Sequence, residues 1–186
     1  MKIGFFGGTF DPPHFGHLNL AIQLKEKHQL DQVLFCPVGI SPFKRSQPPQ
    51  GRHKDRKRMV EMAIAAIPQF LFCSEEMDKE ESFTIDTIRR LKKTHPQDDF
   101  YLLLGEDSFE RFSEWKEAEE LKRLAPLLVG GRGVGKSAKE NITPIPIMDI
   151  SSSEIRERLK KDLYCGHLIP ANVLDYICAN KLYFIS

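Results

Sequence analysis

The sequence predicts an α/β fold, an open parallel sheet with helices on both of its faces. Two observations lead to this prediction. Short runs of continuous apolar residues, typical of strands buried on both faces, recur along the chain. Segments with helical patterning separate them, as the crossover connections of parallel strands require. We expect strands at residues 3–6, 33–36, 70–73, 100–104 and 127–129, and helices at 17–28, 52–67, 83–93, 115–124, 152–161 and 170–180.

The residues that follow the apolar runs show where the first two strands end. The run at 3–6 stops at two glycines, and the apolar residues that follow at 18, 20, 21, 22 and 24 indicate the first helix. The run at 33–36 leads into residues 40–52, which hold several prolines and a glycine and are expected to form a long loop. Ligands of open parallel sheets lie outside the carboxyl ends of the strands, so every loop after a strand is a candidate site.

Length and composition bound the class of protein. The 186 residues, 41% hydrophobic and 10% aromatic, suit a single domain over 1–186, whose core would bury roughly 70% of the unfolded surface. With 27 basic and 26 acidic residues the net charge is +1, so no overall field attracts nucleic acid or a membrane. The first residues are not expected to form a signal peptide, and no apolar run is long enough to span a bilayer. We therefore expect a cytoplasmic protein with neither kind of partner.

The four cysteines predict neither a disulfide framework nor a metal centre. They are scattered along the chain without a Cys-x-x-Cys pair, and two of them end apolar runs as small buried residues do. A structural zinc site is therefore not expected. The four are Cys36, Cys73, Cys165 and Cys178.

Residues 130–137, GGRGVGKS, match the pattern of a phosphate-binding P-loop, G-x-x-x-x-G-K-[ST]. A P-loop needs a helix of real length after its lysine, because the helix N-terminus holds the phosphates. Here Pro144 and Pro146 follow within a few residues and forbid such a helix. We interpret 130–137 as a glycine-rich surface loop.

The stretch GGTFDPPHFGHL, residues 7–18, is the stronger candidate for a phosphate site. Its prolines make a rigid segment that leads to His14 at or just before the first helix. Helix N-termini offer unpaired N–H groups and partial positive charge, and His14 and His17 would share one face of that turn. Gly16 between them would let a phosphate approach the backbone. The pattern indicates a polyphosphate cradle of imidazoles and backbone amides.

Two other interpretations of the histidine pair remain. A His-x-x-His pair can bind a metal, although no third ligand at a sensible spacing is visible in the sequence. The two histidines could also be ordinary residues at a helix start.

These residues, GGTFDP followed by HFGH at 14–17, resemble the signature of the nucleotidylyltransferase superfamily with its T/H-x-G-H phosphate motif. A second resemblance lies at residues 150–156, ISSSEIR, which are similar to the superfamily's I-S-S-T-x-I-R segment. Ser151 and Glu154 there form a capping box, and the Arg156 guanidinium is a planar fork suited to phosphate. The resemblance implies a Rossmann-like sheet of the nucleotidylyltransferase type, with residues 151–186 completing the ATP site.

The middle of the chain resembles the bacterial nicotinate mononucleotide adenylyltransferase family, and the similarity covers nearly the full length. Residues 37–44, PVGISPFK, are similar to its P-x-x-x-x-P-H-K loop, and 82–87, SFTIDT, to its S-Y-T-x-D-T segment. Gly105 to Asp107 with Trp115 are similar to its G-x-D…W arrangement, and 168–183 to its C-terminal tail. Three departures stand out: Phe43 replaces a histidine, Phe83 a tyrosine, and an R-G-V at Arg132 the usual R-P-G.

The resemblance implies transfer of the adenylyl group of ATP to nicotinate mononucleotide, giving nicotinate adenine dinucleotide and pyrophosphate. Mg²⁺ would arrive with ATP rather than in a dedicated metal site. The catalytic residues would be His14, His17, Lys44 and Arg156. ATP would be bound by Gly7, Gly8, Thr9, Phe10, Gly16, Ser151, Ser152 and Ser153. Nicotinate mononucleotide would be bound by Thr84, Gly105, Asp107 and Trp115.

Three alternatives share parts of this pattern. A phosphopantetheine adenylyltransferase has the first motif, although the S-F-T and G-x-D…W features speak against it. An enzyme that prefers nicotinamide mononucleotide would differ only in reading an amide instead of a carboxylate. A non-catalytic nucleotide sensor could use the same fold. A homo-oligomer is compatible with all of them.

Overall fold

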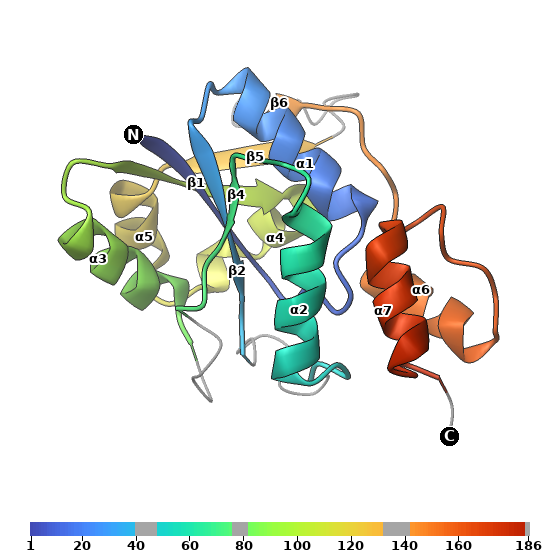
Figure 1. Ribbon diagram of the computed structural model, residues 1–186. Coiled ribbons are helices and arrows are strands. Elements are labelled where there is room, and N and C mark those ends of the chain that lie inside the picture. Colours follow the sequence, from blue (N-terminus) through green and yellow to red (C-terminus); the bar gives the residue numbers. More distant parts are fainter. Residues whose placement is uncertain (40–47, 76–81, 132–141, 185–186) are drawn as a thin grey trace.

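The computed structural model describes residues 1–39, 48–75, 82–131 and 142–184. Its centre is a six-stranded parallel sheet in the order β3-β2-β1-β4-β5-β6 (Figure 1). The predicted α/β class, with a Rossmann-like parallel sheet, is confirmed. The strands are β1 (Lys2–Gly8), β2 (Gln32–Pro37), β3 (Phe70–Phe72), β4 (Asp99–Gly105), β5 (Leu127–Gly131) and β6 (Ile142–Pro144).

Helices cover both faces of the sheet, as predicted. On one face lie α1 (Phe15–Lys27) and α2 (His53–Ile64), and on the other α3 (Thr84–Thr94) and α5 (Ala118–Leu124) (Figure 1). Of the last two helices, α6 (Ser152–Lys160) and α7 (Ala171–Ala179), α7 packs against α2, and both contribute buried residues to the same apolar core. Among the residues that the model describes, no helix is long and apolar enough to cross a membrane.

The strands are continuously apolar because each buries side chains on both faces. Along β1, Phe5 packs with the buried residues of α3 and α5, whereas Phe6 packs with those of α1, α2, α6 and α7. In β4, Leu102 belongs to the same core as Phe5, and Leu103 belongs to the same core as Phe6. Two apolar cores result, one on each side of the sheet, as the alternation of side chains along a strand requires.

The sheet changes direction of winding between β1 and β4, and there the two strands stop pairing early. Their register ends at Phe5 opposite Leu102, while β1 continues to pair with β2 as far as Gly8 opposite Pro37. On the other side, β4 continues with β5 to Gly105 opposite Gly130. The carboxyl ends of β1 and β4 therefore diverge, and this is the switch point at which open parallel sheets bind ligands.

Three details differ from the sequence-based expectation. The predicted helix at 115–124 begins only at α5, and short turns precede it: α4 (Glu106–Glu110) and the 3₁₀ turn η2 (Phe112–Glu114). A sixth strand, β6, pairs with β5 alone, and its position at the sheet edge explains why Pro144 is tolerated at its end. The first helix starts at Phe15, so His14 is its N-cap.

Candidate active site

The loop after β1 folds tightly onto the core. Phe10 is buried with a backbone φ of 47°, in the left-handed region, and its ring packs between Phe6 and Phe35. A side chain at Gly8 would collide with that ring, because its Cβ would lie 2.9 Å from the nearest ring carbon. The second glycine of the motif is therefore needed for close packing. The Asp11–Pro12 peptide that follows is cis.

The two histidines of the motif stack on each other at the start of α1. Their ring centroids are 3.6 Å apart, with 29° between the planes. The backbone N–H of His14 donates to Nδ1 of His17 at 3.2 Å, and His17 also packs edge-on against Phe10. The structure thus brings both predicted imidazoles together at a helix N-terminus, where partial positive charge favours anions.

His14 is buried and neutral. The residue is only 6% exposed, and desolvation lowers its pKa to about 4. Nδ1 of the ring is buried and has no hydrogen-bond partner among the residues that the model describes. At neutral pH the ring therefore offers a hydrogen-bonding nitrogen rather than a positive charge.

Gly16, which the sequence predicts to let a phosphate approach the backbone, lies against His14 in the structure. A Cβ at this position would be 3.0 Å from Nδ1 of His14 and 3.2 Å from the carbonyl oxygen of Met148. The missing side chain therefore leaves room for the His14 ring and for the segment that leads into α6.

Asp11 ties the loop to three other parts of the chain. Its buried carboxylate accepts hydrogen bonds from the backbone N–H of Gln50 at 2.8 Å and of Gly51 at 2.9 Å. The hydroxyl of Tyr183 donates to it at 2.7 Å, and Nη1 of Arg156 lies 3.7 Å away. The loop is thereby clamped to the segment before α2, to α6 and to the residues after α7.

The second predicted motif docks on the same loop. Ser151 caps α6 by accepting the N–H of Glu154 at 3.1 Å, as the capping box predicts, and Ser152 donates to the carbonyl of Pro12 at 2.9 Å. Arg156 donates from Nη1 to the carbonyl of Asp11 at 2.6 Å and from Nη2 to Ser153 at 3.1 Å. Residues more than 130 positions apart in the sequence therefore form one cluster.

The residues predicted to bind nicotinate mononucleotide lie at the carboxyl ends of other strands. Gly105 ends β4 and is the N-cap of α4, Asp107 is exposed in the first turn of that helix, and Thr84 begins α3. Trp115 follows η2, half-buried, with its ring 5.5 Å from that of Phe112. Lys44 and Phe43 lie outside the described residues, as does Arg132.

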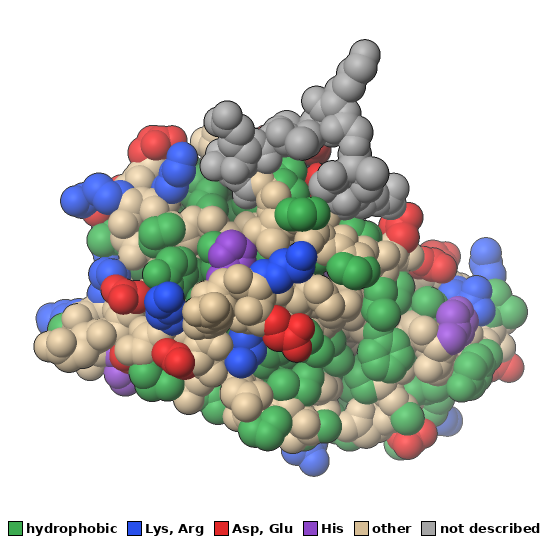
Figure 2. Space-filling view, turned by 90° about the horizontal axis from the view of Figure 1, so that it is seen from above, with side chains coloured by type: hydrophobic (Ala, Val, Ile, Leu, Met, Phe, Trp, Pro, Cys, Tyr) green, Lys and Arg blue, Asp and Glu red, His purple; other side chains and the backbone are tan. Residues whose placement is uncertain are grey.

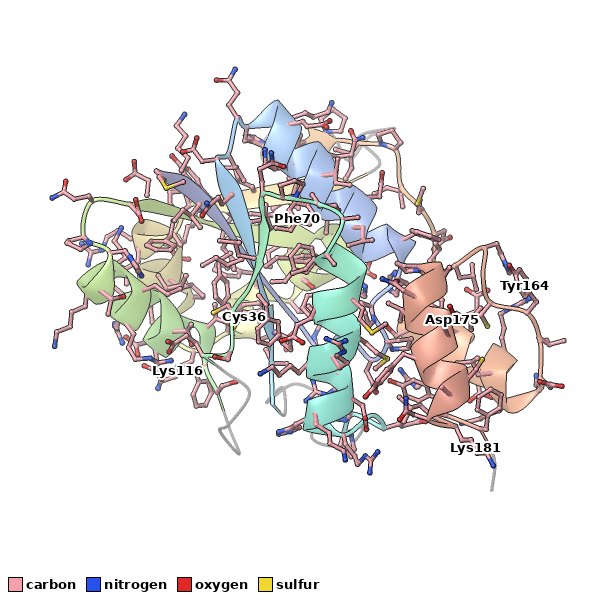
Figure 3. All side chains as sticks on the ribbon, in the orientation of Figure 1. Cys36, Phe70, Lys116, Tyr164, Asp175 and Lys181 are labelled. Atoms are coloured by element: carbon pink, nitrogen blue, oxygen red, sulfur yellow. The ribbon has the colours of Figure 1, made fainter. Side chains whose placement is uncertain are left out.

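Lys116 joins the segment at Trp115 to the start of α3 (Figure 3). Its ammonium lies 4.4 Å from the centre of the Phe83 ring and 3.1 Å from the carboxylate of Asp86. These contacts hold Thr84 and Trp115 in one region, although they come from different connections of the sheet.

The described residues contain no group of three His, Cys, Asp or Glu side chains that could hold a metal ion. The carboxylate next to the histidines in sequence, that of Asp11, is already engaged by N–H and O–H donors. The N–H and hydroxyl donors around this loop suit an anion. Side chains of both signs are interspersed on the face shown in Figure 2.

Two residues at this site were not singled out from the sequence. Tyr183 contacts Asp11 through its hydroxyl, and Arg56 in α2 is fully buried beneath the loop. A signal for Arg56 exists: it occupies the apolar stripe of its helix, with Met59, Val60 and Ala63 at the following core positions. A charge on such a stripe indicates buried hydrogen-bond partners.

Comparison with known proteins agrees with this geometry. The family model described as cytidylyltransferase-like matches residues 5–158. A probable nicotinate-nucleotide adenylyltransferase of Geobacillus thermodenitrificans is 40% identical, covering 98% of this chain and 86% of the relative. A protein of the same description from Dictyoglomus thermophilum is 39% identical over 98% of this chain and 100% of its own.

Solved structures show the same fold. Nicotinic acid mononucleotide adenylyltransferase of Plasmodium falciparum, solved in complex with NaAD, superposes with a TM-score of 0.81 at 23% identity, over 98% of this chain and 97% of its own. A putative nicotinate-nucleotide adenylyltransferase of Vibrio parahaemolyticus has a TM-score of 0.77 at 19% identity, over 100% and 96% of the two chains.

Proposed function

The chain belongs to the cytidylyltransferase-like family, and within it to the nicotinate-nucleotide adenylyltransferases, and on this basis we propose that it makes nicotinate adenine dinucleotide in NAD biosynthesis. The reaction transfers the adenylyl group of ATP to the 5′-phosphate of nicotinate mononucleotide and releases pyrophosphate. The observation that carries the proposal is the cluster of His14, His17, Ser152 and Arg156 around the loop after β1. It lies at the switch point of the sheet, where a nucleotide binds in such folds.

The chemistry fits a site without an obvious general base. A phosphate monoester has its second pKa near ~6, so the attacking phosphate of nicotinate mononucleotide is already ionised at neutral pH. It attacks the α-phosphorus of ATP in line, a new P–O bond forms, and the bond to the pyrophosphate oxygen breaks. The protein has to position the two substrates and to stabilise the charge that builds up on the phosphate oxygens.

We assign these tasks to the clustered residues and to Lys44, which is proposed from the sequence alone. His17, Lys44 and Arg156 would stabilise the oxygens of the triphosphate. Neutral His14 would donate a hydrogen bond to the α-phosphate or to the phosphate that attacks it. Backbone N–H groups of the loop after β1 and of the first turn of α6 would bind further phosphate oxygens.

The substrate is Mg²⁺-bound ATP in this proposal. The metal supplies charge neutralisation on the phosphates, and the anion-binding donor set of the loop fits a metal that arrives with its nucleotide. A cytoplasmic location and a homo-oligomeric state remain predictions from the sequence.

Nicotinate mononucleotide would occupy the region between α3 and Trp115. The N-terminus of α3, at Thr84, would receive the nicotinate carboxylate on backbone N–H groups, and the indole would stack on the pyridine ring. Gly105 and Asp107 would contact the ribose from the end of β4.

Pyrophosphate release tests the function directly. Mg²⁺-ATP is offered with nicotinate mononucleotide, nicotinamide mononucleotide or phosphopantetheine in parallel. Strong preference for the first acceptor is expected. Preference for another acceptor would retain the phosphate site and overturn the substrate assignment. Binding of ATP without release for any acceptor would identify a non-catalytic nucleotide sensor.

A further inference from the structure

Arg56 is a fully buried cation that the reaction chemistry above does not use. It lies in α2 with its side chain closed off from solvent, on the same stripe as Met59 and Val60. A buried charge is costly unless hydrogen bonds replace its water, so its partners show what it is there for. Nη1 donates to the carbonyls of Thr9 at 2.9 Å and Val38 at 2.7 Å, and Nη2 donates to the carbonyl of Gly39 at 3.2 Å.

These partners belong to the two loops that leave β1 and β2. One guanidinium therefore joins the phosphate loop to the start of the neighbouring loop. A planar fork with several donors can do this, because it serves three carbonyls in a fixed relative geometry. An apolar residue at position 56 would leave those carbonyls without the donors that Arg56 provides.

The pinned carbonyls determine where the loop's N–H groups point. In a trans peptide the C=O and the following N–H point in opposite directions. The carbonyl of Thr9 faces Arg56, so the N–H of Phe10 faces away from it. The carbonyl of Gly8 accepts from the N–H of Val38 at 3.0 Å, so the N–H of Thr9 also points away from β2. Phe10, at φ 47°, adopts the left-handed conformation that occurs in anion-binding turns, next to two N–H groups that point away from Arg56 and β2.

The positive charge of Arg56 also favours an anion at this loop. Burial lowers the pKa of its guanidinium, while the nearby carboxylate of Asp11 raises it. A guanidinium stays protonated in proteins. It thus places a permanent positive charge beneath the loop, where the surrounding apolar side chains screen it less than water would.

We propose that Arg56 is a positioning residue for the triphosphate of ATP: it holds the carbonyls of Thr9, Val38 and Gly39 so that the loop presents its N–H groups to phosphate. The proposal rests on the proposed function for the identity of the ligand. It extends that function to a residue that touches neither substrate.

The test compares Arg56→Gln and Arg56→Lys with a matched control in the same helix, Asp55→Ala. Asp55 is equally buried, but its carboxylate bonds to Tyr176 and Arg52 rather than to the phosphate loop. Binding of Mg²⁺-ATP and of inorganic tripolyphosphate is measured by calorimetry, together with kcat, KM for each substrate and thermal stability.

Arg56→Gln is expected to weaken tripolyphosphate binding at least tenfold and to lower kcat tenfold to a hundredfold, with KM for nicotinate mononucleotide changed less than threefold. Arg56→Lys should recover part of both losses because it keeps the charge and two or three donors. Asp55→Ala should lose thermal stability but keep tripolyphosphate affinity and kcat within about threefold.

Wild-type tripolyphosphate affinity and kcat in folded Arg56→Gln would overturn the proposal. If Arg56→Gln does not fold, the test relies on Arg56→Lys. Wild-type tripolyphosphate affinity and wild-type kcat in Arg56→Lys would then overturn the proposal. Equal losses in Asp55→Ala would show a general structural role instead. Because tripolyphosphate binding needs no acceptor substrate, the result stands apart from any failure of the proposed reaction.

Discussion

His14 and His17 stack with their ring centroids 3.6 Å apart, and burial lowers the pKa of His14 to about 4. Two positive imidazoles at that separation would repel each other at a helix N-terminus that already carries partial positive charge. Keeping His14 neutral lets the pair offer hydrogen bonds to phosphate without that repulsion.

Replacing His17 with alanine should lower kcat for pyrophosphate release by roughly 10² to 10³, as loss of a single oxyanion donor does. Fold and ATP affinity should change much less. The matched control is His95→Ala, an exposed histidine after α3, which should keep full activity. A fully active His17→Ala protein would rule out the assigned role.

Burial of His14 makes stability depend on pH. Its pKa is about 4 in the folded state against 6.5 for the free side chain, so the unfolded chain binds the proton first as pH falls below 6.5. The wild type should therefore lose about 2 kcal/mol of stability between pH 7 and pH 5 from this group. Urea unfolding of wild type and His14→Asn at both pH values isolates the contribution. An equal loss in the two proteins would contradict it.

Loss of the Tyr183 hydroxyl should destabilise the protein. Its pKa is raised by burial and by the charge of Asp11, so the hydroxyl stays protonated and donates to the carboxylate. Tyr183→Phe should cost about 1.5–3 kcal/mol in urea unfolding, the range for hydrogen bonds to charged groups. Tyr164→Phe, at a residue that is 72% exposed, serves as the control and should change stability by less than about 0.5 kcal/mol. Matching stabilities for the two variants would refute the clamp.

A substitution at Trp115 should change the KM for one substrate and not the KM for the other. Trp115→Ala should raise KM for nicotinate mononucleotide about tenfold or more, since stacking on an aromatic side chain contributes about 1–3 kcal/mol per base. KM for ATP should stay within about twofold, and Trp115→Phe should restore part of the loss. Steady-state titration of each substrate gives the answer. A parallel rise in both KM values would show that Trp115 supports the fold rather than the pyridine ring.

The sequence predicted the strands β1 to β5 and their parallel arrangement, because strands buried on both faces are recognised by their apolar runs. It did not predict β6, which is three residues long, polar in part and ends in Pro144. Such an edge strand is defined by the neighbour it pairs with, and its own residues carry little signal. The start of α5 was misplaced for a similar reason. Trp115 is extended and Glu117, the N-cap of α5, is in the left-handed region, so the first three residues of the predicted helix are not helical.

The two phosphate motifs were found in the sequence because glycine, histidine and a capping box have local physical signatures. What joins them could not be found in this way. The bonds from Arg156 and Tyr183 to Asp11 depend on the three-dimensional path of the chain, and no spacing rule links positions so far apart. The position of Arg56 on the apolar face of its helix is visible in the sequence. Its carbonyl partners are not, because they lie in loops whose conformation the sequence does not specify.

The contacts of Asp11 also bear on how the protein folds. They join residues separated by 145 and 172 positions in the sequence. Contacts of such long range form late in folding, because the chain loses the entropy of loop closure before the contacts stabilise it. A chain with its sheet formed but these contacts open would hold no complete triphosphate site. Nucleotide added during refolding should then leave the folding rate unchanged, because its binding site is still incomplete in the transition state. It should slow unfolding instead, because it stabilises the native state.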